Sequence, residues 1–331
     1  MDPLFGSLAL LATVSGYGDV DPSGHPAWAE RDMHLWTNAV RVAPEAFEAE
    51  YVRGGCSFSR FSSDEQTAKA PVAYSRDLNE VARLHSADMH ANGALSHTSS
   101  DGTSFQERVS AHYPSVAIGE NIAYNYADTR VVVTEGWMCS TEGHRENIMS
   151  GDWTELGTGV ASVYYTQDFG AAPSAWDGAV TMGIHTPERP SGAVTFYADW
   201  HDAEAPIVLS VMLDGDQHDL SLAYGRDESG VYTTTVDNYD SDGCGAYWFR
   251  WETAAGQEGT FPEDGSYLFG TNCGTSVLWE DSQYDAAAGI LVGGPEDEEP
   301  KGGCATATAP AALGAALGML ALLGRRRQRV A

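Results

Sequence analysis

Hydrophobic side chains recur at helical spacing through the first half of this chain of 331 residues. Residues 28–42 and, more clearly, residues 78–89 each place their apolar positions on one helical face. Residues 129–137 and 144–149 suit two further helices, and short β-type runs follow from Gly157 onward. Helices that alternate with strands and end in a sheet predict an α+β fold built as a three-layer α-β-α sandwich.

The second half of the chain consists of short runs that are rich in β-branched and aromatic residues. Clusters of Asp, Gly and Pro separate these runs at the spacing of an antiparallel β-sandwich. The segment Phe-Pro-Glu-Asp-Gly-Ser-Tyr at residues 261–267 resembles Ig-like modules of bacterial surface proteins. We therefore predict an Ig-like β-sandwich over residues 178–284. Its expected strands are residues 180–184, 194–198, 207–213, 230–236, 247–251 and 266–269.

The first residues have the composition of an export signal. Residues 4–14 form an apolar run with the length of a signal-peptide core, so we predict a signal peptide over residues 1–18 and a linker over residues 19–27. The basic residues that usually precede such a core are missing, so either the signal is truncated or the true start lies elsewhere. On either account we expect an exported protein.

The end of the chain predicts a membrane anchor. An acidic linker at residues 285–303 leads to Cys304, and residues 305–324 then carry no charge. This uncharged stretch is long enough to cross a bilayer core of roughly 30 Å as a transmembrane helix. Four arginines follow it and would hold the C-terminus on the cytoplasmic side by the positive-inside rule. They are Arg325, Arg326, Arg327 and Arg329.

Gly-Gly-Cys, the uncharged stretch and the arginines together resemble the C-terminal sorting signal of myxobacteria. The resemblance implies that residues 304–331 direct the protein to the cell surface or outer envelope, with processing and attachment at Cys304. A plain tail anchor is the alternative. We expect contact with a membrane through this tail only, or release of the protein after processing.

The chain is strongly acidic. It carries 18 Lys+Arg against 47 Asp+Glu, which gives a formal net charge of −29. Such a field repels phosphate groups, so nucleic acids are excluded as partners and an anionic membrane surface is disfavoured. Solubility and salt tolerance explain this acidity better than a role in ligand binding.

Five cysteines are present, and Cys304 belongs to the tail. The other four form one pair in each half, Cys56 with Cys139 and Cys244 with Cys273. An even number of cysteines per domain in an exported chain favours two disulfides. Each would stabilise the fold by roughly 2–4 kcal/mol, mainly by restricting the unfolded chain.

The residues with the clearest chemistry lie between positions 97 and 149. His97 occurs in Leu-Ser-His-Thr, Glu120 in Gly-Glu-Asn-Ile-Ala, and His144 in Gly-His-Arg-Glu-Asn-Ile. These residues are too far apart in the sequence to form a local metal motif, such as two histidines on one helical turn. Any site that they share must be assembled by the fold.

These motifs resemble the CAP superfamily of cysteine-rich secretory, antigen 5 and pathogenesis-related proteins, in particular its bacterial branch. Trp-Thr-Asn-Ala-Val-Arg at residues 36–41 looks like the family's first helix, and residues 96–102 match the loop that carries the first histidine. Residues 157–160 and 164–170 look like its final strands. The resemblance implies a CAP (SCP) domain with the α-β-α fold over residues 28–172.

The resemblance also implies a polar cleft lined by His97, Glu120 and His144. Two imidazoles and a carboxylate would be a ligand set for Zn²⁺ or another divalent cation, with positions left for water. Many relatives place a second glutamate three residues after the tryptophan of the cleft helix, and this chain has Ser140 there. Glu142 is near in sequence and is a further candidate for the cleft.

Three alternatives stay open at this stage. Glu120 would serve structure alone if backbone N–H groups satisfy it and both histidines bond to it. A Cys139–His144 nucleophile would require a free thiol, and no Gly-x-Ser-x-Gly elbow is present. A metal-dependent extracellular hydrolase would use the same cleft. Because the ligand set is incomplete, we expect a binding protein rather than an enzyme, with a lipid, an envelope component or a partner protein as its extracellular ligand.

Overall fold

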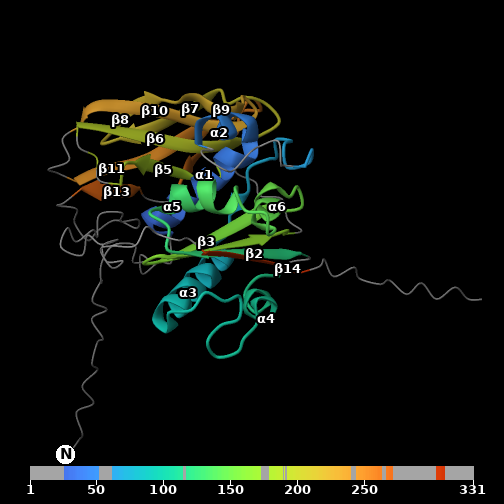
Figure 1. Ribbon diagram of the computed structural model, residues 1–331. Coiled ribbons are helices and arrows are strands. Elements are labelled where there is room, and N and C mark those ends of the chain that lie inside the picture. The colour runs from blue at the N-terminus through green and yellow to red at the C-terminus, as the bar shows by residue number, and fades with distance from the viewer. Residues whose placement is uncertain are drawn as a thin grey trace, which may run out of the picture.

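The computed structural model describes residues 26–51, 62–114, 117–172, 179–188, 190, 192–239, 244–262, 266–270 and 303–309. Figure 1 shows these residues as stacked layers: helices α3 and α4, a β-sheet, a layer of helices around α1, and the strands of the second half. The predicted signal peptide, Cys56, Cys273 and the acidic linker up to residue 302 lie outside the described residues.

The first half of the chain folds into helices on both faces of a sheet. The helices are α1 (Trp28–Val42), α2 (Pro44–Tyr51), α3 (Arg76–Asn92), α4 (Phe105–Ser110), α5 (Thr129–Val131) and α6 (His144–Met149), with a π-helical segment η2 (Val132–Trp137) after α5. The strands run in the order β1-β3-β4-β2-β14, from β1 (Ala73–Tyr74), β2 (Ile118–Tyr124), β3 (Glu155–Ala161), β4 (Tyr164–Gly170) and β14 (Gly303–Ala309). Helices α3 and α4 cover one face of this sheet, and α1, α5 and α6 cover the other (Figure 1).

Two glycines of β3 allow helix α3 to lie directly on the sheet. A Cβ atom added at Gly157 would come within 2.0 Å of the Leu78 carbonyl carbon, and one added at Gly159 within 2.2 Å of the Ala82 carbonyl carbon. Only glycine fits where two backbones approach so closely. The close packing of α3 on β3 therefore explains why glycine occurs at positions 157 and 159. Between α3, α4 and the sheet lies a small core of Leu78, Val81, Phe105, Val109, Tyr113 and Ile118.

Helix α1 is buried on all sides. The first sheet packs against one side of it, and β5, β9 and β10 of the second half pack against the other. Its polar side chains therefore find partners inside the protein. Glu30 forms an ion pair of 2.7 Å with Arg83 of α3. Arg31 donates to the Tyr247 hydroxyl at 3.0 Å, and its guanidinium lies 3.8 Å above the Tyr267 ring. The hydrophobic pattern indicated one buried face, whereas the fold buries the polar face as well.

The second half forms two antiparallel sheets in the described part of the chain. Their strand orders are β5-β6-β10-β9 and β12-β11-β7-β8, with β13 beside β11. The side chains between them form a common core that includes Phe196, Trp200, Val211, Tyr247 and Phe249. The expected β-sandwich is therefore present, and its Ig-like character stays a prediction. The strands are β5 (Gly183–Thr186), β6 (Gly192–His201), β7 (Val208–Leu213), β8 (Asp216–Asp219), β9 (Ser221–Arg226), β10 (Ser229–Tyr239), β11 (Cys244–Glu252), β12 (Glu258–Phe261) and β13 (Tyr267–Gly270).

The two halves of the chain share a core. Ile184 of β5 and Val231 of β10 belong to the same buried cluster as Trp36 of α1. His185 is completely buried beside α1. Its Nδ1 lies 2.9 Å from the Tyr247 hydroxyl, and its carbonyl accepts a hydrogen bond from Trp28 Nε1. The second half is thus packed directly onto the first.

The tail differs from the prediction where the structure describes it. Residues 305–309, expected at the start of a transmembrane helix, belong to strand β14 and pair with β2. Alternating alanine and threonine suits a strand, because β-branched threonine favours extended backbone. None of the helices in the described part of the chain is long and apolar enough to span a membrane. Residues 310–331 lie outside that part.

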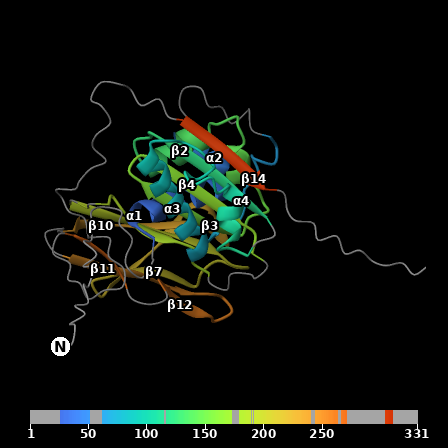
Figure 2. The same ribbon diagram turned by 90° about the horizontal axis from the view of Figure 1, so that it is seen from below.

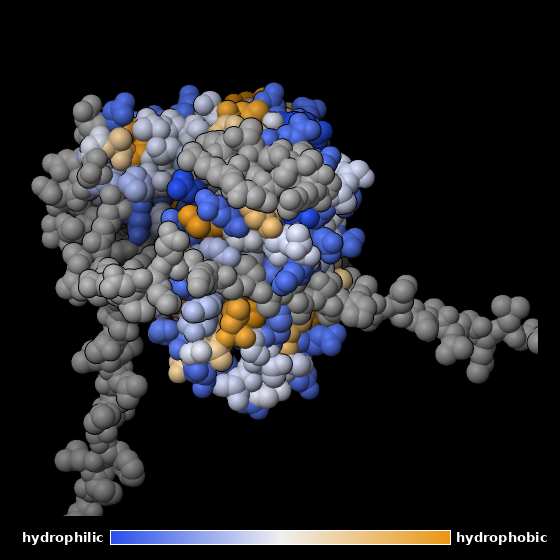
Figure 3. Space-filling model, in the orientation of Figure 1, coloured by the Kyte–Doolittle hydropathy of each residue, from blue (hydrophilic) through white to orange (hydrophobic). Residues whose placement is uncertain are grey.

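Hydrophobic side chains are scattered over the visible surface. On the face shown in Figure 3, hydrophilic residues predominate and hydrophobic ones appear between them. The large apolar side chains that are exposed in the described chain come from four separate segments: Leu84, Tyr124, Ile207 and Leu222. Isolated surface hydrophobics of this kind are ordinary and do not mark an interface.

Candidate ligand-binding site

His97 and Glu120 are in direct contact. His97 lies in the loop after α3, and its Nδ1 is 2.7 Å from Oε1 of Glu120 in the middle of β2. The Glu120 side chain is fully buried, whereas 23% of the His97 side chain is exposed. The fold therefore brings together two of the three residues that were expected to share a site.

Arg108 of α4 completes this contact and was not anticipated. Its Nη2 donates to Oε2 of Glu120, and its Nη1 donates to the His97 carbonyl at 3.2 Å. Helix α4 begins with a capping box in which Ser104 and Glu107 bond reciprocally, and this fixes the helix beside the His97 loop. The Ser-x-x-Glu signature was visible in the sequence and would have placed Arg108 on a short helix. It would not have shown which carboxylate the arginine meets.

Asp168 is a second buried carboxyl group at the same place. It lies directly opposite Glu120 in the antiparallel pairing of β2 with β4, and opposed residues project from the same face of a sheet. Burial raises the pKa of Glu120 to about 7, although Arg108 acts against this. Burial and the neighbouring Glu120 charge raise the pKa of Asp168 well above its usual range. Two carboxyl groups so close in a dry environment cannot both ionise easily, so the pair retains a proton near neutral pH.

The His97 ring is held neutral and oriented. Burial, together with the Arg108 charge, lowers the pKa of His97 to about 4. When Glu120 is ionised, the Nδ1–H of a neutral imidazole donates to it and leaves a lone pair on Nε2. That Nε2 atom is buried and has no hydrogen-bond partner among the described residues. A buried acceptor without a partner is unusual in a folded protein and suits a donor supplied by a ligand or a water molecule.

His85 supports this arrangement from α3. Its Nε2 lies 2.8 Å from the Ser96 carbonyl, next to His97, and 3.9 Å from Glu120 Oε2. The side chain is buried, and burial lowers its pKa to about 3. His85 is thus a neutral core histidine, as its position on the apolar helix face predicted. We refer to His85, His97, Arg108, Glu120 and Asp168 as the His97 cluster.

His144 lies on the other face of the sheet. Asn121, the neighbour of Glu120 in β2, donates to the His144 carbonyl at 3.1 Å. Successive residues of a strand point to opposite faces, so His144 and the Glu120 carboxylate are on opposite sides of β2. The His144 Nδ1 lies 2.7 Å from the Ser140 hydroxyl. Ser140 therefore accompanies His144 rather than Glu120, and the exposed Glu142 donates its backbone N–H to that hydroxyl, at 3.0 Å.

The described residues do not fit the expected metal site. They contain no group of three His, Cys, Asp or Glu side chains that could hold a metal ion. The two Glu120 oxygens already contact His97 and Arg108, and a guanidinium on the carboxylate repels a second cation. The predicted set of His97, Glu120 and His144 is thus not assembled. Glu120 meets His97 on one face of the sheet, and its neighbour Asn121 meets His144 on the other.

Cys139 is disulfide-bonded. It therefore has no free thiol to act as a nucleophile beside His144. Its predicted partner Cys56 lies outside the described residues, as does Cys273, and the Cys244 side chain is not described either. Both pairings stay predictions.

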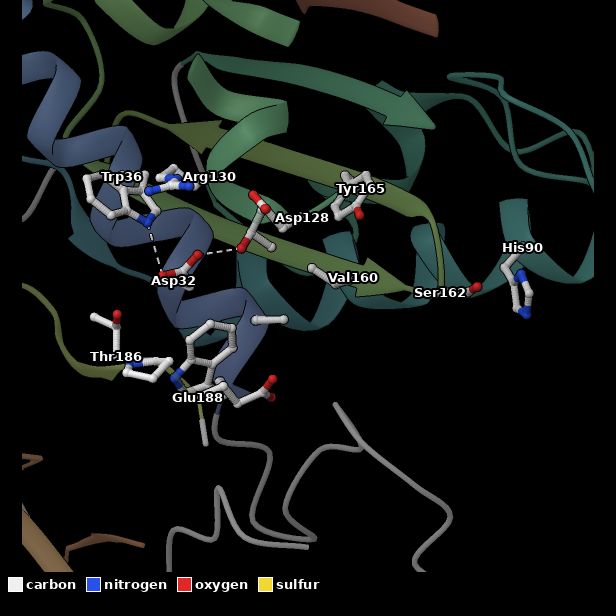
Figure 4. A pocket seen from close by; sticks show the side chains of 14 residues that line it. Asp32, Trp36, His90, Asp128, Arg130, Val160, Ser162, Tyr165, Thr186 and Glu188 are labelled. Carbon is white, nitrogen blue, oxygen red and sulfur yellow. Dashed lines mark hydrogen bonds between the residues drawn. The ribbon is translucent and has the colours of Figure 1, made fainter. Parts of the chain in front are cut away.

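A separate cavity lies between α1 and the second half of the chain. It has a volume of about 690 Å³ and is lined from α1, the start of α5, the β3–β4 turn and the end of β5. Figure 4 shows Asp32 in its wall, where it accepts hydrogen bonds from Trp36 Nε1 at 3.0 Å and from the Thr129 hydroxyl. Burial raises the pKa of Asp32 to about 6. The sequence could not indicate this cavity, because its lining comes from segments as distant as Trp28 and Glu188.

Comparison with known proteins identifies the first half of the chain. The family described as "Cysteine-rich secretory protein family" (CAP) matches residues 37–172. The uncharacterized membrane protein YlbC of Bacillus subtilis (strain 168) is 43% identical over 101 residues, which cover 30% of this chain and 29% of that protein. The uncharacterized protein YkwD of the same organism is 31% identical over 147 residues, 44% of this chain and 54% of that protein. The chain thus spans about half or less of the length of these curated relatives.

Among solved structures, an extracellular protein containing a SCP domain from Bacillus anthracis str. Ames is 33% identical. The match covers 31% of this chain and 35% of that chain, with a TM-score of 0.30.

Proposed function

Since residues 37–172 match the CAP family, we propose that this chain is an exported protein that binds an extracellular ligand at the His97 cluster. The ligand classes that suit the proposal are a lipid, an envelope component or a partner protein. Export is supported by the apolar N-terminal run and by the disulfide at Cys139. The relative YlbC is named a membrane protein, which agrees with a place at the cell envelope.

The observation that carries this proposal is the state of His97. Its ring is fixed by Glu120 on one nitrogen, and the other nitrogen is buried without a partner in the described chain. The side chain as a whole is 23% exposed, so the residue lies at the protein surface, with Nε2 itself covered. A neutral imidazole of this kind accepts a hydrogen bond from a hydroxyl or an amide of the ligand.

Binding is better supported than hydrolysis. The hydrolase alternative requires His97, Glu120 and His144 to hold one ion, whereas the His144 imidazole lies against Ser140. The disulfide at Cys139 leaves that residue no role as a nucleophile. The His97 cluster contains a carboxyl pair that can carry a proton, but it includes no hydroxyl or thiol to attack a substrate.

The cavity beside α1 supports a second candidate, the binding of a small organic ligand. Its volume of about 690 Å³ lies within the range of small-molecule sites. Trp28, Trp36 and Tyr165 supply aromatic surface, Asp128 and Glu188 supply negative charge, and Arg130 supplies one positive charge. A ligand with an apolar body and a positively charged end would suit this lining.

We further propose attachment to the cell surface through the tail, with Cys304 as the processed residue. The support is the sequence of the tail, namely Gly-Gly-Cys followed by an uncharged stretch and arginines. Mass spectrometry of the C-terminus of the exported protein tests this directly. A mature chain that still ends in the arginine cluster would contradict processing at Cys304.

Variants of His97 test the binding site. Co-sedimentation of the full chain with phosphatidylcholine vesicles, with and without cholesterol, and binding to purified lipopolysaccharide cover the lipid and envelope classes. His97→Ala should weaken binding by about tenfold, because one hydrogen bond to the ligand is lost. The matched control is His112→Ala, which changes an exposed histidine at the end of α4. Equal binding by wild type and His97→Ala, together with a loss in Trp28→Ala, would move the site to the cavity.

A further inference from the structure

The segment that contains Cys304 forms an edge strand on the CAP sheet. Strand β14 runs antiparallel to β2 along its full length, from Gly303 opposite Tyr124 to Ala309 opposite Ile118. Figure 2 shows β14 as the red strand beside β2 at the margin of the sheet. Strand β2 is therefore paired on both sides, with β4 and with β14.

Without β14, strand β2 would be the open edge of this sheet. An open edge displays a row of unpaired N–H and C=O groups, which is a template for another extended segment. The residues of β2 from Ile118 to Ala123 are buried. Removal of β14 would expose the backbone edge of β2, which is the surface that a strand recognises.

This edge lies between the two faces that carry the candidate residues. Glu120 and the rest of the His97 cluster are on the α3–α4 face, whereas His144 and Ser140 are on the α6 face. In the pairing, Ala307 is opposite Glu120 and Thr306 is opposite Asn121. Strand β14 also contacts α6 and η2. It thus occupies the margin of the sheet around which a ligand could reach both faces.

We propose that the edge of β2 is a strand-acceptor site and that, in the full chain before any processing at Cys304, the chain's own segment Gly303–Ala309 is its occupant. While docked, the segment covers the margin of the His97 cluster, and when it leaves, both the β2 edge and that margin become accessible. The part about the cluster rests on the proposed function. The strand-acceptor site itself rests only on the pairing of β14 with β2.

The composition of the segment suits this role. Gly-Cys-Ala-Thr-Ala-Thr-Ala contains small and uncharged residues only. Such a strand can lie close to the helices α6 and η2 that flank the edge. Main-chain hydrogen bonds supply the affinity in this mode of recognition, so a short segment of modest sequence is sufficient.

The connection along the chain favours the protein's own segment over that of a second copy. Residues 271–302 connect the segment to β13, so it stays near its acceptor. A tethered segment reaches an effective concentration on the order of millimolar, well above the concentration of a second molecule at micromolar protein. Docking within one chain is therefore expected, and removal of the tether would release the strand.

Hydrogen exchange on the full chain with single proline substitutions tests the pairing. Successive residues of an edge strand direct their N–H groups alternately toward the partner and toward the open side. Of Ala305→Pro and Thr306→Pro, one therefore removes a bond to β2 and the other is tolerated on the open side. The variant that removes a bond to β2 should speed exchange of β2 amides by about tenfold or more. The tolerated variant should leave these amides as in wild type. Amides of β6 and β10 should not change in either variant. No effect in either variant, or equal effects in both, would overturn the proposal.

Peptide binding tests the acceptor directly. The probe is a fluorescent peptide Gly-Ser-Ala-Thr-Ala-Thr-Ala, in which serine replaces the cysteine. It should bind the disruptive proline variant at least about tenfold more tightly than wild type, because wild type is already occupied. Equal binding to both, or a wild type that is dimeric through exchanged strands on size-exclusion chromatography, would contradict a strand docked within one chain.

These outcomes are separable from those of the proposed function. The exchange and peptide experiments can support the strand-acceptor site even if the protein binds neither vesicles nor lipopolysaccharide. In that case only the proposed ligand binding at the His97 cluster would be wrong. Ligand binding that depends on His97 but is the same in both proline variants would leave the binding site standing and remove its coverage by β14.

Discussion

Asn38 Nδ2 donates a hydrogen bond of 2.6 Å to Asp199 Oδ2, and this contact joins helix α1 to strand β6 of the second half. Both side chains are fully buried. Asn38 also bonds both backbone groups of Val72, at 2.9 Å and 3.0 Å. One amide thus connects helix α1 to the residue before β1 and to the second half.

Asn38→Ala should destabilise the whole protein by about 2–4 kcal/mol, because it leaves the buried Val72 N–H without its acceptor and removes one of the two side-chain hydrogen bonds to Asp199, the other coming from Thr181. Chemical denaturation followed by tryptophan fluorescence measures this loss. Asn92→Ala is the matched control, since Asn92 is an exposed asparagine on α3 that bonds only to Asp88. Its effect should stay within about 0.5 kcal/mol. A loss below about 1 kcal/mol for Asn38→Ala would show that the contact matters little.

The Asp199 carboxyl group should make stability depend on pH. Burial raises its pKa from 3.8 to about 8. Between these values the folded chain holds a proton that the unfolded chain has lost, so the free energy of unfolding falls as the pH rises through that window. The Asp199→Asn variant has no carboxyl group at this position and lacks this dependence. From pH 5.5 to pH 8.5, wild type should therefore lose on the order of 3 kcal/mol relative to the variant.

Comparison with the variant isolates this effect from that of the buried histidines. Burial lowers the pKa of His34 to about 4 and that of His185 to about 3, so these groups add stability as the pH rises toward 6.5. They are present in both proteins and cancel in the difference. Parallel stability curves for wild type and Asp199→Asn would show that the Asp199 pKa is not raised.

The local parts of the fold could be predicted from the sequence. The helices expected at residues 28–42 and 144–149 are α1 and α6, with the same bounds, because a local hydrophobic period determines them. The environment of α1 could not be predicted. Its polar residues meet partners from the second half, such as Tyr247 and Asp199, and a local pattern carries no information about distant partners. Strand β14 was missed for the same reason.

The candidate site was predictable to a similar extent. The meeting of His97 and Glu120 followed from the family resemblance. Arg108 and Asp168 were missed, because the position of a short helix and the register of two strands decide which groups meet Glu120. His144 was expected beside Glu120. However, Glu120 and its neighbour Asn121 point to opposite faces of β2, and His144 lies on the Asn121 side.

Arg108 should stabilise the protein mainly when Glu120 is ionised. Arg108→Met leaves a buried carboxylate without its cation, and breaking such a pair typically costs about 3–5 kcal/mol. The pKa of Glu120, about 7 with Arg108 present, would rise further, so at low pH the carboxyl group would take a proton and escape part of this cost. The loss measured by urea denaturation should therefore be larger at pH 8 than at pH 5.

An exposed ion pair supplies the control for Arg108. Arg250 lies 3.6 Å from Glu258, and both side chains are largely accessible, at 40% and 70%. Arg250→Met should change stability by less than about 1 kcal/mol at either pH. Combining Arg108→Met with Glu120→Gln should recover part of the loss at pH 8, because no buried charge remains. A loss that is the same at both pH values would mean that Arg108 acts through packing alone.

Gly159 should not tolerate even a methyl group. Its Cα position lies against the backbone of Ala82 in α3, where an added Cβ would come within 2.2 Å of two backbone atoms. Relief would require α3 to move away from the sheet, and α3 carries His85 and leads into the His97 loop. Gly159→Ala should thus cost about 3 kcal/mol and also weaken any ligand binding that depends on His97. Gly151→Ala is the matched control, because the nearest atom to its Cβ is the Lys69 Cδ at 4.0 Å. Thermal unfolding of both variants measures the difference, and a Gly159→Ala protein as stable as Gly151→Ala would show that α3 does not rest directly on β3.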